Sequence, residues 1–299
     1  MNLIPFLLLL TSCSYLTKHE GKQTDASLPL DGLREKYNAV YQEVESELDP
    51  ATGWISHIDC DSLLWNGLAC SLGFPVNIEL AEYEPGLMGR RPREPHGQCF
   101  TEENGDVGSK SSMSRDSATG YLSCLWGRKD LLAMQRFATR SENNDWFIGI
   151  PKDRFFETNL YFNLAGLLGR MIYVASSGAD DRYYRRTGYL YPPVEKDFER
   201  NIQTQGILLQ DGVDAAYNLT TAINKEMLDR LKENAAAYPD DFLFSAALGR
   251  FTGDQSRALD LLLSDTLVCP SYARGERPDV YCKIIWIQAA KIVLDHLDD

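Results

Sequence analysis

The sequence lacks the short motifs that mark several common enzyme classes. It contains no His-Glu-x-x-His pair, Gly-x-Ser-x-Gly elbow, Walker loop or Gly-x-Gly-x-x-Gly turn. These absences argue against zinc proteases, α/β-hydrolases, nucleotide use and NAD binding. Only four of the 299 residues are histidine, and the run from His57 to Asp61 has no matching second half of a metal site. We therefore expect no metal, nucleotide or other cofactor.

Basic residues are also scarce. Lys and Arg number 30 against 43 Asp and Glu, which gives a formal net charge of −13. No Lys/Arg-rich tract interrupts this balance, so nucleic acid is not an expected partner. The acids are spread along the chain rather than gathered in a tail, which is typical of a soluble surface.

No hydrophobic run is long enough to cross a bilayer, but a short one opens the chain. The apolar stretch from Leu3 to Leu10 leads into Leu10-Thr11-Ser12-Cys13. These four residues resemble the bacterial lipoprotein signal. The resemblance implies a signal peptide over 1–12, lipidation of Cys13, a tether over 13–29 and, from Ser14, sorting to the outer membrane. An ordinary signal peptide or an apolar N-terminal helix is the alternative.

The cysteine count agrees with export. Without Cys13, six cysteines remain, an even number that allows three disulfides in fifteen connectivities. Cys269 and Cys282 flank a loop with Pro and Gly, so we predict a local bridge between them. Cys70 and Cys124 lie in apolar helical runs, where buried free thiols are an equally reasonable interpretation.

The remaining chain, 30–299, has helical spacing of its apolar residues and few strand signals, which predicts a single all-α domain. The segments 31–48, 59–73, 114–127 and 223–236 each carry helical spacing or helix-end signals. The segments 160–175 and 284–294 are apolar on almost every side and must be buried on every side. Amphipathic helices that alternate with apolar ones suggest an inner layer covered by an outer layer.

A Gly-Arg pair recurs at the end of three apolar helical runs, at Gly127-Arg128, Gly169-Arg170 and Gly249-Arg250. The intervals are close to one and two times about 40 residues, which suggests repeated helical hairpins. About six such hairpins with buried inner helices resemble the (α/α) toroid of several glycoside hydrolase and polysaccharide lyase families. An open superhelix similar to tetratricopeptide repeats is the alternative.

One long segment, 84–113, breaks the helical pattern. It is rich in Gly, Pro and Ser and carries the densest basic cluster of the chain, with Arg90, Arg91, Arg93 and His96. Loops of this length are commonly functional. We expect either a solvated surface loop or a cleft wall that contacts an anionic or polyhydroxyl ligand.

Acids gather where helices are expected to start, at Asp59, Asp61, Asp116, Asp211 and Asp214. One interpretation is helix capping, and we read Asp211 to Asp214 in this way. The other is that a toroid brings such helix starts together on a cleft floor, where two carboxylates could cleave a glycosidic bond. Elimination would need a His or Tyr base instead.

The resulting site hypothesis has two sets of residues. The catalytic candidates are Asp59, Asp61 and Asp116. The ligand-binding candidates are Arg90, Arg91, His96, Arg115 and Trp54. Trp65 and Tyr121 are further possible stacking platforms, although the core is the favoured interpretation for both.

The sequence thus predicts an envelope lipoprotein, anchored to a membrane by lipid, that binds or cleaves glycans. This expectation rests on analogy between folds, and folds host many functions. The alternative is a non-catalytic scaffold that binds a protein or peptide on its helical surface.

Overall fold

A computed structural model describes residues 27–55, 60–92, 113–144, 164–182, 195–216, 225–273 and 277–298. The described chain is mainly helical, so the all-α prediction is confirmed. Its helices are α1 (Ser27–Glu45), α2 (Ser62–Ser71), α3 (Arg115–Arg128), α4 (Leu131–Asn143), α5 (Leu164–Ala175), α6 (Asp197–Ala216), α7 (Lys225–Ala237), α8 (Phe242–Thr252), α9 (Ser256–Leu263) and α10 (Pro278–Asp298). A 3-10 turn, η1 (Ile78–Ala81), precedes two short antiparallel strands, β1 (Glu82–Glu84) and β2 (Leu87–Met88).

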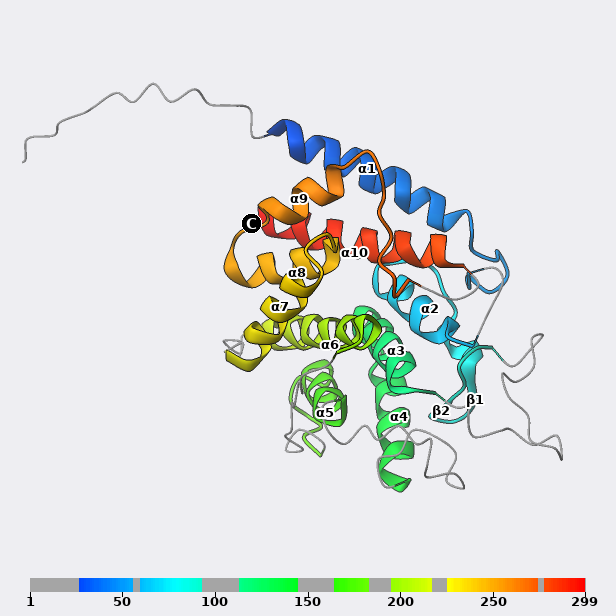
Figure 1. The fold of residues 1–299 in the computed structure, drawn as a ribbon. Helices are drawn as coiled ribbons and strands as arrows, with labels where there is room; N and C mark the ends of the chain where they lie inside the picture. Colours follow the sequence, from blue (N-terminus) through cyan, green and yellow to red (C-terminus); the bar gives the residue numbers. More distant parts are fainter. Residues whose placement is uncertain are drawn as a thin grey trace, which may run out of the picture.

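The last helix, α10, lies at the centre of one half of the molecule, between α1, α8 and α9 (Figure 1). Its apolar residues are buried on nearly all sides, as expected for the run 284–294. Trp286 is 1% exposed, and Tyr281 stacks on Trp65 of α2 with ring centroids 4.8 Å apart. Helix α1, which opens the described chain, also packs on α10.

Helices α2 and α3 form the tightest pair. Gly67 and Gly120 lie at the crossing, where a Cβ on Gly120 would overlap the carbonyl oxygen of Leu64. Further along, Cys70 of α2 is disulfide-bonded to Cys124 of α3. Because residue numbers rise in the same direction along both helices, the pair is parallel and both helices begin at the same end.

Two disulfides join described residues. The predicted bridge between Cys269 and Cys282 is confirmed, with Cα atoms 5.4 Å apart. The Cys70–Cys124 bridge resolves the open choice for these residues in favour of a disulfide. Cys60 is also disulfide-bonded.

The prediction that Asp211 and Asp214 start a helix is wrong. Both lie in the last two turns of α6, with side chains only 9% and 6% exposed. The Asp211 carboxylate accepts from Arg250 Nε at 2.6 Å, and the Asp214 carboxylate pairs with Arg170 Nη1 at 2.6 Å. Buried carboxylates need such partners, so these acids connect α6 to α5 and α8 rather than cap it.

The Gly-Arg pairs differ from one another in their positions in the helices and in their contacts. Gly127-Arg128 ends α3 as expected, and Arg128 donates to the carbonyl oxygen of Val76. Gly169-Arg170 lies inside α5, so the expectation that it ends a helix is wrong. The toroid of about six hairpins stays a prediction.

Two boundaries differ from the expected ones. Helix α1 begins at Ser27, inside the tether expected over 13–29. The segment 84–113 was expected to be irregular, but Glu84 ends β1 and Leu87–Met88 form β2, with Glu82 facing Met88 and Glu84 facing Leu87. The turn between the strands is held by Glu82, which accepts from the N–H of Gly86 at 2.6 Å.

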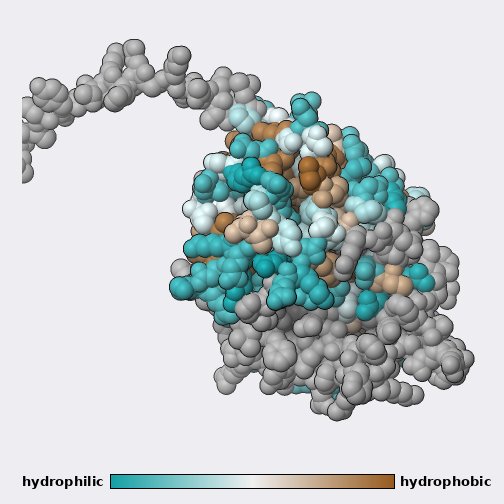
Figure 2. All heavy atoms as spheres, in the orientation of Figure 1, coloured by the Kyte–Doolittle hydropathy of each residue, from teal (hydrophilic) through white to brown (hydrophobic). Residues whose placement is uncertain are grey.

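The surface agrees with the acidic composition. Figure 2 shows mainly hydrophilic residues on the visible described surface, with hydrophobic residues in small patches over the upper part, where Figure 1 places α1, α9 and α10. Within the described ranges, no helix is long and apolar enough to span a membrane.

Candidate functional site

The starts of α2 and α3 lie side by side, as the site hypothesis requires. The residues after β2 connect them: the N–H of Leu63 donates to the carbonyl oxygen of Arg90 at 2.9 Å, and the N–H of Met113 donates to that of Met88 at 3.1 Å. One short segment thus satisfies backbone groups at both helix starts. The parallel geometry of the pair makes this possible.

Asp61 and Arg90, a catalytic and a ligand-binding candidate, form an ion pair. Arg90 Nη1 lies 3.4 Å from Asp61 Oδ1, and the Asp61 side chain is 40% exposed. Asp61 occupies the N-cap position of α2, but its side chain makes no capping hydrogen bond. The carboxylate is therefore directed to the arginine rather than to the helix.

The start of α3 is built as a helix cap. Ser114 accepts from the N–H of Ser117, and Asp116 lies in the first turn, as the capping interpretation predicted. Arg115 is the first residue of α3, and Arg91 is half-buried beside the candidate site. Asp59, His96 and Cys13 lie outside the described residues.

The aromatic candidates belong to the core. Trp54, proposed as a ligand-binding residue, is 0% exposed, and its indole N–H donates to the carbonyl oxygen of Asn77 at 2.7 Å. Trp65 stacks on Tyr281, and Tyr121 packs edge-on against Phe137 with centroids 5.3 Å apart. These rings pack against other side chains and present no open face for a sugar, so this part of the hypothesis is wrong.

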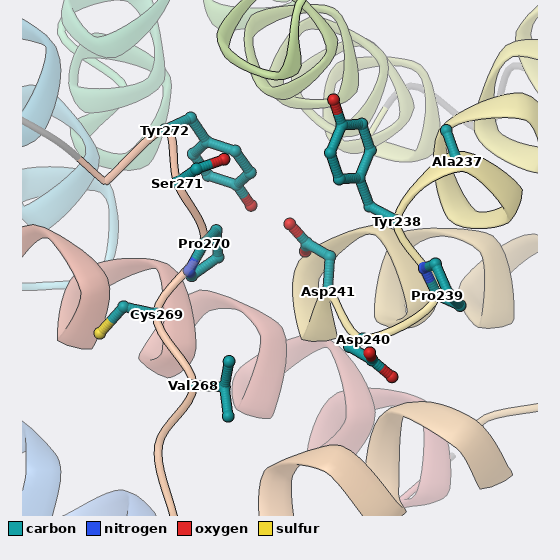
Figure 3. Close-up of a pocket in the computed structure, with 10 residues that line it drawn as sticks. All are labelled: Ala237, Tyr238, Pro239, Asp240, Asp241, Val268, Cys269, Pro270, Ser271 and Tyr272. Atoms are coloured by element: carbon teal, nitrogen blue, oxygen red, sulfur yellow. The ribbon is translucent and has the colours of Figure 1, made fainter.

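A second candidate site lies where the turn between α7 and α8 meets the segment that precedes α10 (Figure 3). The two stretches enclose a pocket of about 220 Å³. Its lining consists of Ala237, Tyr238, Pro239, Asp240, Asp241, Val268, Cys269, Pro270, Ser271 and Tyr272. The lining contains two acids and two tyrosines but no basic side chain.

Asp241 is the N-cap of α8 and the most buried acid of the pocket. Its Oδ1 accepts from the N–H groups of Leu243 at 2.9 Å and Phe244 at 3.0 Å. The residue is 6% exposed, and burial raises the pKa of its carboxyl to about 6, against the opposing effect of these hydrogen bonds. Both backbone hydrogen bonds fall on Oδ1, so Oδ2 carries no part of the cap.

Tyr272 and Tyr238 approach Asp241 from opposite sides (Figure 3). Tyr272 is 1% exposed, and its hydroxyl points toward the Asp241 carboxyl without reaching hydrogen-bond geometry with any described group. Burial and the nearby Asp241 raise the pKa of Tyr272 well above its usual value. Tyr238 is half-buried and packs edge-on against Phe244, which leaves part of its ring to the pocket.

The segment 268–273 is fixed at both sides of the pocket. Ser271 donates its hydroxyl to Asp197 in the first turn of α6, and Cys269 is bonded to the buried Cys282 of α10. Asp240 points away from Asp241 in Figure 3 and pairs with Arg257 at 2.7 Å. The two neighbouring carboxylates therefore do not converge on one point.

This arrangement favours binding over bond cleavage. Hydrolysis of a glycosidic bond needs two carboxylates that flank it, and the two acids of this pocket are directed apart. A sugar ring could instead stack on Tyr238 and exchange hydrogen bonds with Asp241 and the Tyr272 hydroxyl. Among the described residues, no group of three or more His, Cys, Asp or Glu is placed to hold a metal ion.

Comparison of the chain with protein-family models, with curated proteins and with solved structures found no match. The function is therefore inferred from the geometry of the molecule.

Sequence reasoning missed the second site, although one signal was present. Pro239-Asp240-Asp241 precedes the apolar helix α8, which is typical of a turn followed by an N-cap. Nothing local shows that Asp241 is buried, because Tyr272 and its neighbours come from a segment some thirty residues later.

Proposed function

We propose that the protein is an exported, lipid-anchored envelope protein that binds a saccharide in the pocket formed by Tyr238, Asp241 and Tyr272. The observation that carries this proposal is the composition of the pocket: one half-buried aromatic ring opposite a buried hydroxyl and a buried carboxyl. Saccharides present both apolar ring faces and hydroxyl groups, and such a pocket matches both.

The volume of the pocket limits the size of the ligand. Its volume of about 220 Å³ lies below the roughly 300–1,000 Å³ that is usual for drug-sized ligands. One sugar unit is the appropriate size, and a longer glycan would extend from the opening. The function proposed is thus recognition of a single unit rather than of an extended chain.

The disulfides support export. Cys70–Cys124 and Cys269–Cys282 are both formed, and such bonds persist in oxidising compartments outside the cytosol. Together with the resemblance at Leu10-Thr11-Ser12-Cys13, they favour a mature chain that begins with lipidated Cys13. Labelling of cells with a palmitate analogue tests the anchor: the parent should be labelled and Cys13→Ala should not, whereas an unlabelled parent contradicts it.

Binding is tested with a panel of envelope monosaccharides and short glycans, by calorimetry on the parent and on Tyr238→Ala. The parent should bind at least one saccharide without releasing a cleavage product, and Tyr238→Ala should bind it at least tenfold more weakly, since aromatic contact is lost. Tyr173→Ala, which alters a half-buried tyrosine of α5, is the matched control and should bind as the parent does.

Absence of binding to every saccharide, or equal effects of Tyr238→Ala and Tyr173→Ala, would overturn the proposal. Capture of a peptide on the helical surface with no saccharide bound would favour the scaffold alternative instead.

A further inference from the structure

We infer that the Asp241 pocket selects a ligand that carries a protonated amine, so that an amino sugar binds in preference to its neutral or acidic counterparts. This inference rests on the proposed function for the sugar, and it adds the charge of the ligand. It is based on the charges that surround Asp241.

The carboxyl of Asp241 is buried without a basic partner. The groups that lower its pKa are the N–H groups of Phe244 and Leu243 and the hydroxyl of Tyr272, and among the described residues no Lys or Arg contributes. Elsewhere in the fold, the buried acids Asp211 and Asp214 each have an arginine. Asp241 is the contrasting case, because a buried carboxylate without a cation is costly in free energy.

Three described charged groups beside the pocket, Asp197, Asp240 and Arg257, are acidic or already paired. On the side of α6, Asp197 accepts from Ser271, which adds a second negative charge behind the pocket wall. On the side of α9, Arg257 is held by Asp240 at 2.7 Å and by the carbonyl oxygen of Pro239 at 3.2 Å. The field in the pocket therefore favours a cation and repels an anion.

The start of α8 does not reverse this preference. A helix N-terminus attracts anions through its free N–H groups. Here Asp241 already accepts from two of those groups, which leaves its Oδ2 and the Tyr272 hydroxyl to meet the ligand. The Tyr272 hydroxyl is buried, has no described partner in hydrogen-bond geometry and points toward the Asp241 carboxyl, whose pKa it lowers.

An ammonium group fits these contacts. It has three N–H donors and no acceptor. One donor can reach Asp241 Oδ2 and another the oxygen of Tyr272, while the ring of Tyr238 provides an aromatic neighbour that tolerates positive charge. A carboxylate in the same place would face Asp241 and Asp197 with no compensating base.

The test compares glucosamine, N-acetylglucosamine, glucuronate and ethylammonium as ligands of the full chain, by calorimetry between pH 5 and pH 7. Amines of this kind remain mostly protonated over this range. Glucosamine should bind about tenfold or more tightly than N-acetylglucosamine at pH 7, as expected for a charge-assisted hydrogen bond. Its affinity should fall several-fold toward pH 5, because protonated Asp241 gives up its charge, while that of N-acetylglucosamine should stay constant.

Asp241→Asn should remove both the preference and its pH dependence, since Asn still caps the helix but carries no charge. Asp254→Asn, which alters an exposed acid before α9, is the matched control and should keep the preference. If Asp241→Asn does not fold, the pH dependence of the parent alone decides the question.

Equal or tighter binding of N-acetylglucosamine, tighter binding of glucuronate, or an amine affinity independent of pH would overturn this inference and leave the proposed function standing. Binding of ethylammonium without any saccharide would support the charge preference and overturn the saccharide proposal. Binding of none of the four probes would overturn both.

Discussion

Asp61 and Asp241 occupy the same position relative to a helix, immediately before its first turn, yet their surroundings differ. Asp61 is 40% exposed on its side chain, makes no capping hydrogen bond and pairs with Arg90. Asp241 is buried, caps α8 through two N–H groups and has no described basic partner. The same residue type at the same helical position thus gives a surface ion pair in one case and a buried carboxyl that faces a pocket in the other.

The difference comes from distant segments. Arg90 reaches Asp61 because β2 runs across the starts of α2 and α3. The segment with Tyr272 covers Asp241 because Cys269 is bonded to α10. Asp241 becomes a site candidate because no Lys or Arg contributes to its surroundings among the described residues.

The largest expected effect concerns the disulfides that stabilise the two regions. Removing Cys70–Cys124 should cost about 4 kcal/mol and removing Cys269–Cys282 about 3 kcal/mol, because the closed loops span 54 and 13 residues. Urea unfolding of the two double Cys→Ala variants measures both. Ligand binding should weaken only when Cys269 and Cys282 are replaced; the reverse pattern would remove the link between that bridge and the pocket.

The next largest effect is expected for Gly120→Ala, which alters the crossing of α2 and α3. An added Cβ overlaps the backbone of Leu64, so α2 and α3 must move apart, at a cost of about 3 kcal/mol. Gly212→Ala in α6 is the control, since its Cβ would meet only Trp126 at 3.5 Å, and it should be neutral or stabilising. Thermal unfolding measures both, and a neutral Gly120→Ala would contradict the close crossing.

The raised pKa of Asp241 should make the stability of the protein depend on pH. The pKa of Asp241 is raised in the folded state to about 6 from 3.8, so the folded chain binds the proton more tightly than the unfolded chain. Its contribution is fully present below pH 3.8 and is lost as the pH rises through about 6, an amount of order 3 kcal/mol. Asp241→Asn should therefore gain stability relative to the parent between pH 4 and pH 7.

Urea unfolding at both pH values measures this gain. A constant difference between the parent and Asp241→Asn would contradict the burial of a carboxyl that lacks a cation.

The smallest effects are those of simple truncation at pH 5. Asp241→Ala should cost about 1–2 kcal/mol through the lost cap, whereas Asp61→Ala should cost less than about 0.5 kcal/mol because its ion pair is exposed. Chemical denaturation of both variants gives the two values. An equal loss of unfolding free energy in the two variants would contradict the difference between the two helix starts.

Much of the fold follows from local patterns. Apolar spacing and end signals predicted the helices now seen as α1, α2, α3, α5, α7 and α10, and Asp116 was correctly placed at a helix start. The boundary errors arose where local and distant effects compete. Asp211 and Asp214 look like helix-start acids in sequence, but their arginines come from α8 and α5 and allow them to be buried late in α6.

Less of the candidate site than of the fold could be predicted from the sequence. Asp61 and Arg90 were nominated separately, and the structure pairs them. Trp54 was nominated as a ligand-binding residue because tryptophans often stack on sugars, but the carbonyl oxygen of Asn77 satisfies its indole in the core. The Asp241 pocket depends on contacts between α8 and the chain before α10, which no local pattern records.

The most direct test of this account is an NMR titration of the Asp241 carboxyl carbon in the full chain, with and without glucosamine. The account predicts a midpoint near pH 6 in the free protein, from the pKa of about 6, and a lower midpoint when the amine is bound. A midpoint near pH 4 without ligand, or a midpoint that glucosamine leaves unchanged while it binds, would contradict it.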